Sequence, residues 1–114
     1  MKGYPLGMIL DACPDIVGYA KGGISSWRDF MTTADLVRKI LAISQSAWEE
    51  AQLAMGREAA AVVAAAMLQK AGAINSAGGY LRNLTEKARG GQFPAGPMLM
   101  ALIRTRHRGQ QLSA

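Results

Sequence analysis

The residues of this sequence best suited to chemistry are basic side chains near a tyrosine, and they suit binding to a polyanion. One group of these basic residues lies within residues 74–89. The other group consists of arginines at every second position near the C-terminus. The candidate nucleic-acid-binding residues are Tyr80, Arg82, Lys87, Arg89, Arg104, Arg106 and Arg108, with Lys70 as a further candidate. Arginine and lysine neutralise phosphates, and a tyrosine ring can stack on an unpaired base. Two alternatives remain open: Tyr80 is a core residue with its hydroxyl at the rim, and Arg82 pairs with Glu86.

The charge of the chain is divided unevenly. The 114 residues carry a formal net charge of +5. Residues 1–66 hold six Lys/Arg and seven Asp/Glu, whereas residues 67–114 hold seven Lys/Arg and a single acid, Glu86. A near-neutral body with a basic C-terminal third is typical of nucleic-acid-binding proteins, and it also fits a solvated basic surface with a loose tail.

Residues for catalysis or metal binding are sparse. The sequence has one cysteine, Cys13, and one histidine, His107, which are too few for an ordinary zinc site. Asp11 and Asp15 are expected to be surface charges rather than an acid–base pair. Cys13 is interpreted as a small buried hydrophobe. We therefore expect no enzymatic activity, no metal and no cofactor.

Two glycines, Gly78 and Gly79, fall in the first turn of the helix that would carry Tyr80, after Asn75 or Ser76 as N-cap. Each glycine costs about 1 kcal/mol relative to alanine inside a helix, so something should require the missing side chains. One explanation is close packing against another helix. The other is the approach of a phosphate to free N–H groups at the helix start. No glycine-rich nucleotide-binding pattern follows a strand here.

The apolar pattern predicts an all-α fold. Half of the residues are hydrophobic and only 6% are aromatic, which favours helix over sheet. Helices are expected over about 4–13, 27–41, 47–55, 57–71, 77–89 and 98–106, with a loop over 15–25. The prediction is a compact bundle of five or six short helices, with one domain over 1–108 and a frayed tail over 109–114.

Serines mark the expected helix starts. Ser25 or Ser26 is expected to N-cap the second helix, and with Ser26 as the cap Asp29 falls at position N3. Ser46 and Glu49 have the spacing of a capping box for the third helix, and Ser44 is the competing cap.

Two helices carry further signals about packing. The second is apolar on two sides, because Leu36 and Ile40 lie opposite its main stripe, as is usual for a helix packed between neighbours. Residues 59–69 carry no charge and include many alanines, which predicts a buried helix at the centre of the fold. The apolar run 59–68 is too short and too weakly hydrophobic to span a bilayer, and no signal peptide is expected.

Six segments occur in an order that carries a family resemblance. They are residues 11–15 (DACPD), 23–29 (GISSWRD), 43–48 (ISQSAW), 75–82 (NSAGGYLR), 84–89 (LTEKAR) and 96–102 (GPMLMAL). Each motif alone is weak, and the ordered set is fairly specific. Together they resemble the C-terminal domain of RepC, the replication initiator of repABC-type plasmids of alphaproteobacteria. The family has a proline where Gln45 stands, which favours Ser44 as the N-cap.

The resemblance implies a cytoplasmic, non-enzymatic domain of an initiator. This initiator would support replication at a plasmid origin and so contribute to plasmid copy number. The resemblance also implies that this chain is a fragment, without the N-terminal part of the family that looks like a winged-helix origin-binding region. The implied partners are plasmid origin DNA, single- or double-stranded, and host replication proteins such as the helicase or its loader; no membrane partner is expected. The segment 78–82 is also loosely similar to a tyrosine-bearing helix of DnaD-like helicase loaders.

The alternative function is a protein-interaction or self-association module with no direct DNA contact. The chain has seven methionines, and Met98 and Met100 beside the basic tail could belong to an adaptable binding surface. The competing interpretation is that these methionines fill the core.

Overall fold

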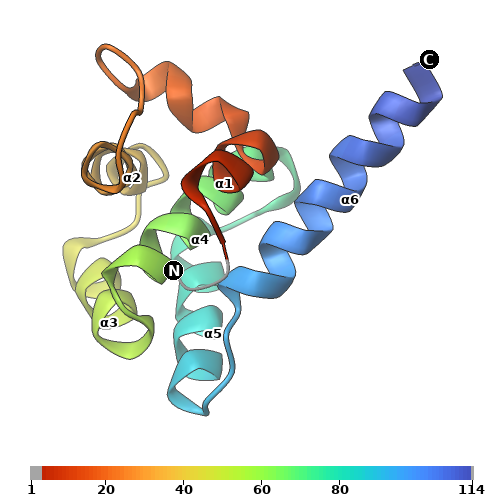
Figure 1. Ribbon diagram of the computed structural model, residues 1–114. Helices are drawn as coiled ribbons and strands as arrows, with labels where there is room; N and C mark the ends of the chain where they lie inside the picture. Colours follow the sequence, from red (N-terminus) through yellow and green to blue (C-terminus); the bar gives the residue numbers. More distant parts are fainter. Residues whose placement is uncertain (1–3, 114) are drawn as a thin grey trace.

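The fold consists of α-helices joined by short turns. The computed structural model describes the backbone of residues 4–113 and the side chains of residues 4–109. These residues contain no strand, so the all-α prediction is confirmed (Figure 1). The elements are α1 (Leu6–Ala12), the 3-10 helix η1 (Pro14–Tyr19), α2 (Trp27–Ile40), α3 (Gln45–Met55), α4 (Arg57–Gln69), the 3-10 helix η2 (Ala71–Ala73), α5 (Ala77–Arg89) and α6 (Ala95–Ser113).

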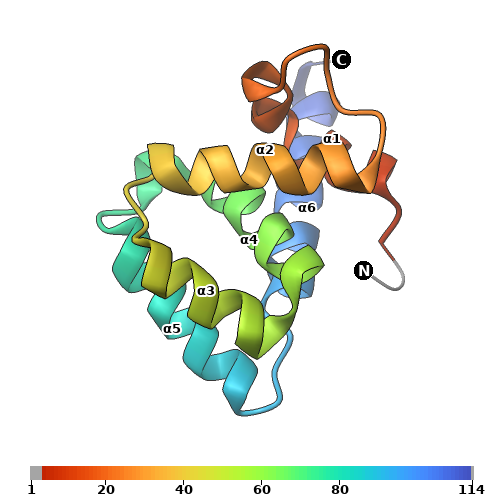
Figure 2. The same cartoon turned by 90° about the vertical axis from the view of Figure 1, so that its left-hand side faces the viewer.

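Helix α4 is the centre of the fold. Its alanines and valines are small, so neighbouring helices can approach it from several sides. Every residue from Ala60 to Met67 is buried. Helices α2, α3 and α6 and the 3-10 helix η1 all pack against α4, and Figure 2 shows the other helices arranged around it. The prediction of a buried central helix is confirmed.

The N-cap of helix α2 is Ser26, one of the two predicted caps. The Ser26 hydroxyl accepts a hydrogen bond from the Asp29 N–H at 3.1 Å. The Asp29 carboxylate accepts in return from the backbone N–H and the hydroxyl of Ser25, at 3.0 and 2.9 Å. These hydrogen bonds, the backbone one first, lower the pKa of Asp29.

Only one side of α2 is covered. Phe30, Ala34 and Val37 are buried towards α4 and η1. Leu36 and Ile40 on the other side are 44% and 48% exposed. The prediction that α2 packs between neighbours is therefore wrong, because the helix lies at the edge of the bundle (Figure 2).

The N-cap of α3 is Ser44, not Ser46. The Ser44 hydroxyl accepts a hydrogen bond from the Ala47 N–H at 3.2 Å. Glu49 takes no part in a capping box, because its carboxylate accepts from the Gln45 amide at 3.0 Å instead. The helix consequently starts at Gln45, two residues earlier than the capping-box prediction.

The N-terminal segment is more ordered than predicted. A loop was expected over 15–25, but η1 covers the first part of this range, with Pro14 in its first turn. Ile16 of η1 is fully buried and holds this turn against α4. Cys13 is also fully buried, which confirms its interpretation as a small hydrophobe. Burial, with a smaller effect of Asp15, raises the pKa of the Cys13 thiol to about 12.

Helix α6 is longer than the predicted 98–106. It starts at Ala95 with Pro97 in its first turn, which the helix tolerates because the first N–H groups need no intrahelical acceptor. It continues beyond Arg106 to Ser113, since arginine and glutamine are good helix formers. Fraying of residues 109–114 in solution, and the domain limit at 108, stay predictions.

Candidate nucleic-acid interface

Helix α5 carries the first group of predicted site residues. Its N-cap is Ser76, whose hydroxyl accepts from the Gly79 N–H at 3.2 Å. Leu81 and Leu84 are buried on the side of α5 that packs along α3. Tyr80 is half-buried, and it lines a cleft together with Lys87, two helical turns further on. The structure thus brings these two candidate residues together.

The expected pair of Arg82 with Glu86 does not form. Glu86 makes an ion pair with Arg89 instead, three residues further along the helix. Arg82 is exposed and has no ion pair within the described part of the chain. Of these two arginines, Arg82 carries an unpaired charge within the described residues, whereas Arg89 shares its charge with Glu86.

Close helix packing does not explain the two glycines at the start of α5. A Cβ atom added at Gly78 would meet nothing within 4 Å. At Gly79 it would meet only the side chain of Ser76, with the hydroxyl oxygen at 3.3 Å. The packing explanation is wrong, and the approach of a phosphate stays a prediction.

Helix α6 is anchored by its first half. Ala95, Met98 and Leu99 are buried, and the helix packs on α4 and α1. Met98 therefore belongs to the core, as one interpretation of the methionines expected, whereas Met100 is 37% exposed.

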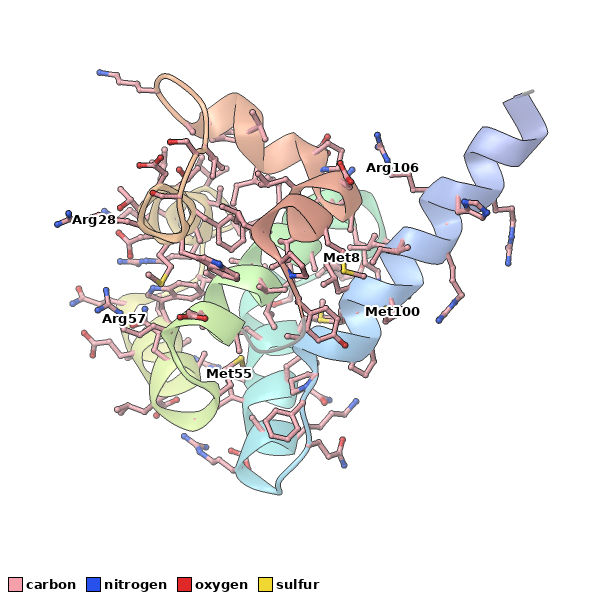
Figure 3. All side chains as sticks on the ribbon, viewed as in Figure 1. Met8, Arg28, Met55, Arg57, Met100 and Arg106 are labelled. Atoms are coloured by element: carbon pink, nitrogen blue, oxygen red, sulfur yellow. The ribbon has the colours of Figure 1, made fainter. Side chains whose placement is uncertain are left out.

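The second half of α6 projects from the body (Figure 1). It carries three exposed arginines, which we name the α6 arginine row: Arg104, Arg106 and Arg108. Within the described residues, none of the three has an acidic partner. Figure 3 shows the side chain of Arg106 leaving α6 on the side that faces the N-terminal helices.

The structure separates the predicted site into two surfaces. Figures 1 and 2 both show α5 running to one end of the molecule and the C-terminal half of α6 running to the other. We name the first surface the α5 basic face, comprising Tyr80, Arg82 and Lys87. Arg89 is held by Glu86, and Lys70 is half-buried at the C-cap of α4. The α6 arginine row and the α5 basic face do not form one continuous patch.

Two arginines of the near-neutral body were missed by sequence reasoning. Arg28 and Arg57 line one cavity between α2, α3 and α4. They are far apart in the sequence and belong to no common motif, so no local signal could have paired them.

Signals for metal binding and membrane insertion are missing from the described residues. Residues 4–113 contain no group of three or more His, Cys, Asp or Glu that could hold a metal ion. In the same part of the chain, no helix combines the length and apolar character needed to cross a membrane.

Comparison with known sequences places the chain in a family. Residues 5–105 match the family described as "Replication protein C C-terminal region". The chain belongs to this family. The resemblance to RepC drawn from the six ordered segments is therefore confirmed, and the matched region ends within α6, between Arg104 and Arg106.

Two curated relatives support this membership, and each is provisionally named replication protein C. The Rhizobium rhizogenes protein is 49% identical over 110 residues, which cover 96% of this chain and 27% of the relative. The Sinorhizobium fredii protein is 48% identical over 115 residues, covering 100% of this chain and 28% of the relative. The chain thus spans about a quarter of the length of these relatives. No solved structure matches it significantly.

Proposed function

We propose that this chain is the C-terminal domain of a plasmid replication initiator and that it binds origin DNA. Membership of the replication protein C family supports the initiator role. In this proposal the domain acts in the cytoplasm, without catalysis, and adds DNA affinity to an initiator whose other parts recognise the origin.

The α6 arginine row carries the DNA-binding part of the proposal. Arg104 and Arg108 are one helical turn apart and share a face, whereas Arg106 lies round the other side. Cationic groups therefore surround the projecting half of α6, on a helix whose first half is fixed in the core. Exposed arginines of this kind bind phosphates without reading sequence, so we expect affinity for the DNA backbone.

Fluorescence anisotropy with labelled single- and double-stranded oligonucleotides, across a salt titration, tests this role. Replacing Arg104 and Arg108 with glutamine should weaken binding by about tenfold and make the slope of log K against log salt shallower by about 2 for duplex DNA. The matched control replaces Lys21 and Lys39, two exposed lysines outside α6, with glutamine. Equal losses in both variants would show that net charge alone drives binding, and no loss in the α6 variant would refute the site.

A second candidate function is docking to a protein, either host replication machinery or another copy of the chain. It is favoured by Phe93, which is 82% exposed in the turn between α5 and α6 and borders two clefts. Exposed aromatic residues of this type often supply much of the binding energy at protein interfaces. Light scattering should detect a dimer, or a helicase complex, that Phe93→Ser abolishes and Leu36→Ser leaves intact. A monomer that binds no helicase would count against this function.

A further inference from the structure

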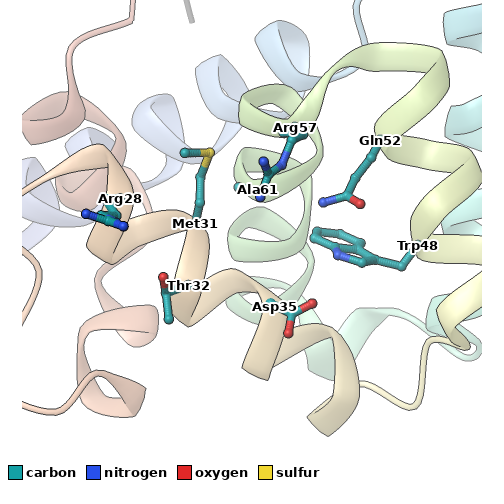
Figure 4. Close-up of a pocket in the computed structure, with 8 residues that line it drawn as sticks. All are labelled: Arg28, Met31, Thr32, Asp35, Trp48, Gln52, Arg57 and Ala61. Carbon is teal, nitrogen blue, oxygen red and sulfur yellow. The ribbon is translucent and has the colours of Figure 1, made fainter.

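A cavity between α2, α3 and α4 lies apart from both basic surfaces. It has a volume of about 480 Å³, a size typical of small-molecule sites. In Figure 3, Arg28 and Arg57 lie on one side of the molecule and Arg106 on the other. We name this space the α2–α4 cavity, and Figure 4 shows the side chains around it.

One side of the cavity is cationic and rich in hydrogen-bond donors. In Figure 4, Arg57 and Gln52 lie on the same side of Trp48. Arg57 has no ion pair within the described residues, and it is the first residue of α4. The N-cap of α4 is Gly56, which has no side chain to cap the first N–H groups, so the positive end of the helix dipole adds to the charge of Arg57. Glu58 in the same turn offsets part of this charge, but it does not line the cavity. An anion is the complementary ligand for this side.

The opposite side offers an acceptor. Asp35 lies across Trp48 from Arg57 and Gln52 (Figure 4). Its two carboxylate oxygens are 3.6 Å from Arg38 Nε and 3.8 Å from Lys39 Nζ. Both partners belong to α2 and do not line the cavity, whereas the Asp35 carboxylate does and can accept N–H groups of a ligand.

The middle of the cavity is apolar. Trp48 is only 4% exposed and forms a floor fixed in the core. Met31 is half-buried and bounds the cavity from α2. A flat group lying between the cationic side and the acceptor would contact both side chains.

We propose that the α2–α4 cavity binds a nucleotide. Its phosphate lies at Arg57 and Gln52, with Arg28 at the mouth as a second cation. Its base lies over Met31 and the exposed part of Trp48, and an exocyclic amino group donates to the carboxylate of Asp35. A carboxylate accepts well from the amino group of cytosine, whereas thymine presents a carbonyl oxygen at that position. The nucleotide is either free or one unit of a single strand, and the proposal does not depend on DNA binding by α6.

Trp48 provides the signal for a direct test. In a Trp27→Phe background, Trp48 is the sole tryptophan, because the chain has two. Titration with dCMP should give a saturable change in its fluorescence, and dTMP should bind about tenfold more weakly. Arg57→Gln should weaken dCMP binding by about tenfold, as expected when a charged hydrogen bond is lost, and Arg57→Lys should restore part of it. Lys21→Gln removes one exposed charge from outside the cavity and both basic surfaces; it is the control and should leave dCMP binding unchanged.

Oligo(dC) distinguishes the two sources of the ligand. If the site holds a single strand, Arg57→Gln should weaken the binding of both dCMP and oligo(dC). If the site holds a free nucleotide, Arg57→Gln should weaken only the binding of dCMP. The variant with Arg104 and Arg108 replaced should still bind dCMP, so failure of this proposal and failure of the α6 proposal are distinguishable. Three results would each overturn the inference: no saturable response to dCMP, inorganic phosphate binding as tightly as dCMP, or an Arg57→Gln protein that keeps its fold by circular dichroism and binds dCMP normally.

Discussion

Helices α5 and α6 carry the same number of predicted DNA-binding cations and use them differently. Helix α5 packs against α3, and one of its arginines is held by Glu86. Helix α6 packs only through its first half, and its three arginines stand on the projecting half. The charge of a segment therefore forms a binding surface only where the local packing leaves that charge unpaired and accessible.

The largest effect should come from the buried anchor of α6. Leu99 is fully buried, so Leu99→Ala should lower the free energy of unfolding by about 3 kcal/mol. Met100→Ala is the control on the outer side of the same helix and should cost less than about 1 kcal/mol. Urea unfolding followed by circular dichroism measures both, and equal losses would show that the first half of α6 is not anchored in the core.

A smaller effect is expected when the two basic surfaces are compared directly. Replacing Arg82 and Lys87 with glutamine removes the same charge from α5 as the Arg104 and Arg108 replacement removes from α6. The α5 variant should lose about threefold in duplex affinity and the α6 variant about tenfold, because fewer phosphates can reach α5. If anisotropy ranks the two variants the other way, the α5 basic face is the main contact.

Two glycines should respond with opposite signs to the same substitution. Gly78→Ala in α5 should raise the free energy of unfolding by about 0.5–1 kcal/mol, because the added Cβ enters open space. Gly96→Ala in α6 should lower it by about 0.5–1 kcal/mol, because the added Cβ would lie 3.0 Å from the Tyr4 hydroxyl. Thermal melts of the two variants would contradict this account if both shifted the midpoint the same way.

The smallest effect concerns the ion pair on α5. Glu86→Gln should change stability by less than about 0.5 kcal/mol, since Glu86 and Arg89 are both well exposed. It should free Arg89 and slightly raise the DNA affinity of the α5 basic face, narrowing the difference between the two helices. Repeating the anisotropy titration on this variant checks the direction; a fall in affinity would mean that Glu86 orients Arg89 for binding.

Local signals in the sequence predicted local structure well. The serines before α2 marked the start of that helix, and Ser26 is its N-cap. The uncharged residues of α4 marked a buried central helix, which the structure confirms. The start of α3 was misplaced because Ser44 and Ser46 both fit a cap, and the Gln45–Glu49 contact that decides between them is visible only in three dimensions. The end of α6 was placed too early because its exposed arginines have no apolar stripe, although their helix propensity is high.

The candidate site was less predictable than the fold. The basic residues of α5 and α6 are close in sequence, but nothing in the sequence shows that the two helices diverge. Arg28, Trp48 and Arg57 come from three different helices, and only the packing of α2 and α3 on α4 brings them around one cavity. Long-range packing of this kind has no counterpart in the spacing of residues.

Backbone amide NMR shifts on adding a short duplex would show whether the projecting half of α6 is the main DNA contact. If it is, the largest shift changes should fall on residues 103–109, and raising the salt concentration should reverse them. Changes confined to α5, with residues 103–109 unaffected, would contradict it.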